Sequence, residues 1–194
     1  MKQTVTVDRR PRHGMALATL AILAFSLSSV PARAQSSECA AALAASQNPA
    51  YPSVSVKRYI KTPMGYLLVL RMGDNVFAQI EAFAICEHVP SASLSAIGFA
   101  NVTFGFWDAN KKAFNPKTFQ NVEMASIVGS LAWKDGKPSI HAHGVAGDKL
   151  FDTYGGHILA MEVGTGSLEV TVSVYPQRLE REIDPNIGAN VLGL

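Results

Sequence analysis

The sequence predicts an α+β fold, in which a largely antiparallel sheet carries one main helix in a single compact domain. Its 194 residues are about the size of one ordinary domain. Residues 74–90 have apolar side chains at helical spacing. Most of the chain after residue 54 instead consists of strand-like apolar runs, separated by breaks that carry Gly, Asp, Asn or Pro. One helix packed on an antiparallel sheet is the economical arrangement of such elements.

The first 34 residues have the order of a secretory signal peptide. Lys2, Arg9, Arg10 and Arg12 precede an apolar run over residues 15–30, and Ala32-Arg33-Ala34 follows it. The run is shorter than the roughly 20 residues that span a bilayer, and a retained anchor is the alternative. We expect residues 1–34 to be a signal peptide cleaved after Ala34, which leaves a periplasmic or secreted protein with no membrane span.

Removal of this segment would reverse the sign of the net charge. The whole chain has 17 basic and 15 acidic residues, and residues 1–34 hold five of the basic and one of the acidic ones. Residues 35–194 therefore carry a formal net charge of −2. Nucleic-acid-binding domains are usually basic, so this balance argues against a nucleic-acid partner.

The N-terminal half predicts a tether, two strands and the helix. Residues 35–54 are small and polar, which predicts a tether with one short helix over residues 39–45. Strands are expected at residues 57–61 and 66–71. The helix should start with Asp74 as its N-cap and end before Pro90.

The C-terminal half predicts a series of strands and a tail. The strands are expected at residues 94–106, 113–119, 123–133, 139–145, 157–163 and 168–174. They complete a domain over residues 55–176. The C-terminal tail, residues 177–194, is charged at first and then apolar, so we expect it to lie against a neighbour.

The chain has two cysteines, Cys39 and Cys86. Export would place them where a disulfide persists. Cys86 also fits an ordinary buried thiol, because it lies in the apolar helical pattern. The sequence leaves both interpretations open.

Three histidines form the most informative pattern. His141 and His143 are two residues apart in a strand, so their side chains share one face at about 7 Å. His157 follows Gly155-Gly156 at the start of the next apolar run. Three neutral imidazoles are a common ligand set for zinc or a similar divalent metal, and they leave a fourth position open. A hydrogen-bonded or surface histidine pair is the alternative.

The position of His157 depends on how the two strands are connected. A tight turn centred on Gly147-Asp148 would pair His143 with Asp152 and leave His157 farther along. The site therefore requires a longer connection, a bulge at Gly155-Gly156, or a third ligand from another subunit.

Other chemistries have weaker support in the sequence. No G-x-S-x-G elbow and no phosphate-binding loop is present. Glu123 is the one residue that we name as a general acid or base beside a metal, and the reaction would be unknown.

The ordered motifs resemble the plants-and-prokaryotes-conserved (PPC) domain family over residues 57–175. The resemblance rests on Phe104-Gly105-Phe106, Asp135-Gly136-Lys137, His141-Ala142-His143 and Gly155-Gly156-His157-Ile158. It implies a compact α/β domain, association as a homotrimer and, in some prokaryotic members, a bound zinc held by the residues at His141, His143 and His157. Phe99 and Trp107 depart from the usual pattern and would reshape a pocket.

The resemblance leaves three functions to compare. The first is an exported homotrimer that binds a metal and a small anionic ligand through the three histidines. The second is a metal-dependent enzyme. The third is DNA binding by analogy with plant members, which carry AT-hooks. The nearest stretch to an AT-hook here, Arg9-Arg10-Pro11-Arg12, lies in the expected signal peptide.

Overall fold

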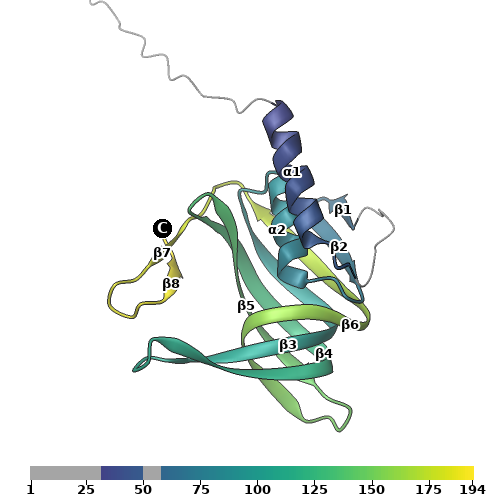
Figure 1. Ribbon diagram of the computed structural model, residues 1–194, viewed down its shortest axis with the longest axis vertical. Coiled ribbons are helices and arrows are strands. Elements are labelled where there is room, and N and C mark those ends of the chain that lie inside the picture. Colours follow the sequence, from purple (N-terminus) through teal and green to yellow (C-terminus); the bar gives the residue numbers. More distant parts are fainter. Residues whose placement is uncertain (1–31, 50–57) are drawn as a thin grey trace, which may run out of the picture. The chain divides into compact units, whose positions relative to one another are not determined.

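The computed structural model describes residues 32–49 and 58–194. Most of the expected signal peptide and the end of the expected tether lie outside these ranges. No helix in the described ranges is both long and apolar enough to cross a membrane. The elements are α1 (Ala32–Ser46), β1 (Tyr59–Thr62), β2 (Gly65–Arg71), α2 (Val76–Cys86), β3 (Ser91–Asp108), β4 (Ala113–Lys134), β5 (Lys137–Gly147), β6 (Thr153–Tyr175), β7 (Arg181–Ile183) and β8 (Asn190–Leu192) (Figure 1).

The main sheet has six antiparallel strands in the order β1-β2-β6-β3-β4-β5. β5 also pairs with β6, so that β3, β4, β5 and β6 form a closed ring (Figure 1). β7 and β8 form a separate two-stranded hairpin. The expected α+β class is confirmed.

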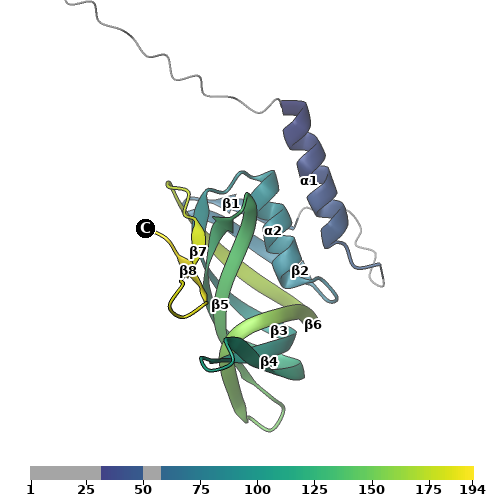
Figure 2. The same cartoon turned by 60° about the vertical axis from the view of Figure 1, so that its left-hand side comes forward.

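The core lies between α2 and one face of the sheet. Val76 and Ile80 of α2 are almost fully buried, and each such side chain contributes about 1.5–3 kcal/mol of burial free energy. They line the same small apolar hollow as Ala142 of β5. In Figure 2, α2 and the β7–β8 hairpin lie on opposite sides of β5. Side chains that alternate with Ala142 therefore point away from the core.

Two strands each join two of the expected runs. β4 joins the runs at 113–119 and 123–133, and β6 joins those at 157–163 and 168–174. The residue expected to break β4, Asn121, has a positive φ of 47°, and the β3–β4 register shifts beside it, between Ala100 and Val102. The Asn121 side-chain oxygen accepts a hydrogen bond from the Thr165 N–H at 2.9 Å. The strands bend here instead of ending, because side chains satisfy the backbone groups that the irregularity frees.

The N-cap of α2 differs from the expectation. The side-chain oxygen of Asn75, not Asp74, accepts from the Ala78 N–H at 3.0 Å. Asp74 is buried; it accepts from the Arg71 N–H at 2.7 Å and pairs with Arg58 at 3.3 Å. The prediction of Asp74 as cap was wrong by one residue, because Asp74 closes the turn before the helix.

The described part of the expected tether is docked onto α2. Its helix, α1, is longer than the stretch over residues 39–45, and it includes the expected cleavage position after Ala34. A disulfide joins Cys39 of α1 to Cys86 at the end of α2. Gln79 of α2 donates to the Ser46 carbonyl at 3.0 Å.

The C-terminal tail lies against β4 of its own chain. The Trp133 N–H donates to the Leu179 carbonyl at 2.9 Å, and the Arg178 guanidinium lies 4.1 Å from the centre of the Trp133 ring. Arg181, at the start of β7, donates to the Ser130 hydroxyl at 2.7 Å. These contacts place the β7–β8 hairpin beside β5.

Candidate metal centre

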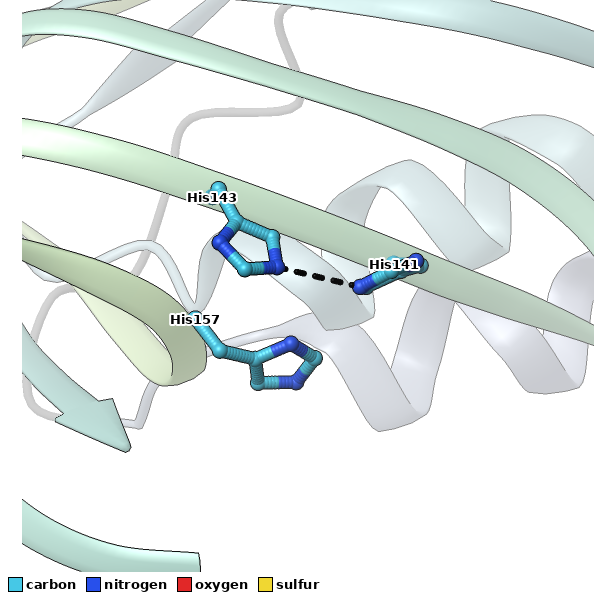
Figure 3. A group of neighbouring side chains, drawn as sticks. All are labelled: His141, His143 and His157. Atoms are coloured by element: carbon cyan, nitrogen blue, oxygen red, sulfur yellow. Dashed lines mark hydrogen bonds between the residues drawn. The ribbon is translucent and has the colours of Figure 1, made fainter. Parts of the chain in front are cut away.

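His141 and His143 project from β5 on the face opposite α2. Ala142 between them is buried, whereas both histidines are exposed. This follows from strand alternation, and it brings the two rings together as expected. Their Nε2 atoms are 3.2 Å apart (Figure 3).

His157 joins them through the register of β5 and β6. Cα partners in this ladder include His143 with His157 and Gly147 with Thr153. Residues 148–152 form the connection, so the turn is longer than a tight turn centred on Gly147-Asp148. Of the three arrangements considered, the longer connection is the one present. The ladder is regular through Gly155-Gly156, and the third imidazole comes from the same chain.

Asp148 closes this connection. One carboxylate oxygen accepts from the N–H groups of Leu150 (2.8 Å) and Asp152 (3.1 Å), and the other accepts from the Tyr154 hydroxyl at 3.1 Å. The hydrogen bond from the Leu150 N–H is the largest cause that lowers the pKa of Asp148. The Asp148 side chain therefore adds three hydrogen bonds to the two backbone hydrogen bonds of this loop, from the Asp148 N–H to the Asp152 carbonyl and from the Phe151 N–H to the Asp148 carbonyl.

Gly155 permits the two strands to pair closely near the site. A Cβ at this position would lie 2.8 Å from the Gly144 carbonyl oxygen across the ladder. A larger residue would push β6 away from β5, and His157 is only two residues farther along β6.

The three rings converge on one point. One nitrogen from each of His141, His143 and His157 lies within 4.8 Å of the others (Figure 3). Two imidazole nitrogens on one tetrahedral zinc, each about 2.1 Å from it, lie about 3.4 Å apart. The 3.2 Å separation of the Nε2 atoms of His141 and His143 is close to that value, and the nitrogen of His157 lies within 4.8 Å of both. The donor set and the spacing fit zinc or a similar ion.

The surroundings favour neutral rings. Burial, as the largest cause, together with the neighbouring histidines and Arg181 lowers the pKa of His157 to about 4. Burial, Arg181 and His143 lower the pKa of His141. Both rings are therefore neutral near pH 7, as metal ligands must be. His157 also stacks on Phe114 with the ring centres 4.5 Å apart, which fixes its orientation.

The histidines open into a cavity of about 880 Å³. Phe106, Trp107 and Phe114 contribute aromatic walls, and Ile183 and Val191 of the C-terminal hairpin contribute an apolar wall. The lining residues in the described part of the chain include no Asp or Glu. Trp107, one of the two departures from the family pattern, thus lines the cavity, whereas Phe99 pairs with Glu123 elsewhere.

The structure does not bring Glu123 to the histidines. Glu123 lines a separate hollow of about 280 Å³ together with Glu169 and Ser167. Val128 of β4 lies opposite His143. Glu123 is five residues from Val128, so the two positions are about 16 Å apart along the strand.

Sequence reasoning missed Arg181. Arg181 is only 6% exposed, it donates to Ser130, and its Nε has no hydrogen-bond partner among the residues that the structure describes. The charged start of the tail gave no sign that one of its arginines would be buried beside the histidines. The apolar residues that follow were the available signal that the tail packs on something.

Comparisons with known proteins agree with this fold. The family model of the Plants and Prokaryotes Conserved (PCC) domain matches residues 59–176. The structure of a proposed DNA-binding protein from Ralstonia eutropha JMP134 is 61% identical, with a TM-score of 0.69, covering 71% of this chain and 96% of that one. A metal-containing protein from Archaeoglobus fulgidus is 30% identical, with a TM-score of 0.59 and coverage of 70% and 98%.

A third structure supports the fold alone. It is a plant- and prokaryote-conserved (PPC) protein from Pyrococcus horikoshii, 24% identical, with a TM-score of 0.59 and coverage of 71% and 94%. No curated protein matches this chain.

Proposed function

The chain belongs to the Plants and Prokaryotes Conserved domain family, and on that premise we propose that it binds one divalent metal ion, zinc or a similar one, through His141, His143 and His157. The observation that carries the proposal is the convergence of three imidazole nitrogens within 4.8 Å, from two adjacent strands of one sheet. The metal-containing relative from A. fulgidus supports it.

The site suits binding better than catalysis. Three protein ligands leave one position of a tetrahedral ion open, and the ion would supply a Lewis acid there. The side chains around it in the described chain offer no carboxylate that could move a proton. His141, His143 and His157 would hold the ion, and the aromatic walls would hold an organic ligand and exclude water.

The proposal includes export and a homotrimer. The signal-peptide pattern of residues 1–34 and the disulfide between Cys39 and Cys86 support export, because disulfides persist in oxidising compartments. The family resemblance supports the trimer. So does a set of exposed apolar side chains on the sheet, Ile97, Val128 and Val145.

DNA binding is not part of the proposal. The R. eutropha relative is a proposed DNA-binding protein. In this chain, residues 35–194 have a formal net charge of −2, so a duplex would meet no net positive charge.

Metal analysis of the purified protein tests the proposal. Residues 35–194 are stripped with a chelator, exposed to zinc, desalted and measured by mass spectrometry of the metal. We expect about one zinc per protomer. Protein that stays free of metal after this treatment would contradict the assignment.

A further inference from the structure

Arg181 is a buried charge without an acidic partner. Its side chain is 6% exposed, and no carboxylate of the described residues lies within 4.0 Å of its guanidinium. The Ser130 hydroxyl accepts from one Nη, and the Nε is buried with no acceptor. Burying an arginine is costly unless an anion compensates for the lost hydration.

The guanidinium lies on the histidine side of the sheet. Ser130, which it contacts, is the direct partner of His141 in the β4–β5 ladder. Directly opposed residues of an antiparallel pair project to the same face.

A bound metal would leave this region with an excess of positive charge. A divalent ion on three neutral imidazoles carries two positive charges, and Arg181 adds a third. Neither the metal ligands nor the other residues that line the cavity include an acidic side chain. Positive charge of this kind is stabilised by an anion at the open coordination position.

The cavity also limits the size and polarity of the organic group that is attached to that anion. Its volume of about 880 Å³ is in the range of small-molecule sites. Phe106, Trp107 and Phe114 line it, with Ile183 and Val191 from the hairpin. Among the described residues that line it, the polar side-chain groups besides the histidines are the amide of Asn190 and the indole N–H of Trp107.

We propose that the ligand of this metal centre is an organic carboxylate with an aromatic or apolar body. Its carboxylate takes the open position on the metal, and its body lies against the aromatic wall. Arg181 is a positioning residue that favours the anion by its charge from beside His141, without lining the cavity. This inference rests on the proposed metal binding.

Cobalt(II)-loaded protein provides the test, because the visible absorption of cobalt reports on its coordination. Benzoate is titrated into residues 35–194 loaded with cobalt. Benzyl alcohol is the control for the ring without the charge, and acetate is the control for the charge without the ring. We expect benzoate to change the cobalt spectrum at the lowest concentration, acetate to require more, and benzyl alcohol to cause no change.

Two variants separate the role of Arg181 from a structural one. Arg181→Met removes the charge and keeps an apolar stem, and it should weaken benzoate binding by at least about tenfold. Its cobalt affinity should be unchanged or higher, because a positive charge near the ion is removed. Arg71→Met is the matched control, because Arg71 is exposed at the end of β2 and lines no part of the cavity, and it should change neither affinity.

Each outcome has a distinct meaning. Failure to load cobalt would overturn the metal site and this inference together. Cobalt loading without a benzoate effect, or equal binding of benzoate by Arg181→Met, would overturn this inference alone. If Arg181→Met does not fold, Arg181→Gln, which keeps a donor for Ser130, takes its place with the same expected loss.

Discussion

His143 and His157 lie directly opposite each other in the β5–β6 ladder, and the loop over residues 148–152 sets this register. The metal site therefore depends on a loop that contains none of its ligands. The hydrogen bonds of Asp148 hold that loop.

Asp148→Ala should weaken zinc binding by about three- to tenfold, because three hydrogen bonds that fix the loop are lost. A competition titration against a chromogenic chelator measures the affinity. Asp152→Ala is the control, since the contacts of Asp152 in the loop are made by its backbone. Equal affinities of Asp148→Ala and wild type would show that the loop does not control the site.

Replacement of any one of the three histidines by alanine should reduce zinc affinity by about 100-fold or more, since each supplies one of three protein ligands. The melting temperature of the metal-free protein should change little for His141→Ala and His143→Ala, because both residues are exposed, and should fall more for His157→Ala, which is half-buried and stacks on Phe114. His88→Asn is the control: His88 is exposed beyond the end of α2, and asparagine tolerates its positive φ of 52°. Full zinc occupancy in His143→Ala would make the assignment wrong.

The metal-free protein should lose stability as the pH falls from about 7 to about 4. The folded state lowers the pKa of His157 from 6.5 to about 4, and that of His141 in the same direction. The unfolded chain therefore binds more protons in this window, which favours unfolding. Melting temperatures across the window should fall less for His157→Phe than for wild type. Identical pH profiles would exclude His157 as a cause.

Loss of the disulfide should lower stability without affecting the metal. Cys39 and Cys86 close a loop with a sequence separation of 47, and the chain-entropy relation gives about 4 kcal/mol for such a loop. We expect the Cys39→Ser, Cys86→Ser double variant to lose about 2–4 kcal/mol in urea unfolding. Its zinc affinity should stay at the wild-type value, because Ala142 of β5 packs with α2 and the alternating His141 and His143 point to the other side. A matching loss of zinc affinity would show that the two regions are coupled.

Residues 35–194 should sediment with the mass of three protomers at micromolar concentration. Val128→Asp, which places a charge on the exposed apolar face, should shift the mass toward one protomer. Lys117→Asp is a control for a new acidic group elsewhere on β4. A wild-type protein with the mass of a single protomer would rule out the trimer.

The sequence predicted those parts of the fold and the site that depend on local spacing. Period-two and period-3.6 patterns are visible within a short window, so the sheet, α2 and the shared face of His141 and His143 could be predicted. Contacts between residues far apart in the sequence could not be predicted. The continuity of β4 depends on the hydrogen bond between Asn121 and Thr165, and the position of Arg181 depends on the docking of the tail on Trp133. In both cases the two contacting segments are distant in the sequence, so no local pattern shows them.

The lining of the cavity is divided between two parts of the chain. The histidines and the aromatic wall lie within residues 106–157, whereas Ile183 and Val191 belong to the β7–β8 hairpin. A chain shortened to end before Arg181 would therefore keep all three histidines and lose both the buried guanidinium and the apolar wall. The last residues of the chain thus shape the space in front of the histidines without contributing to the histidine cluster itself.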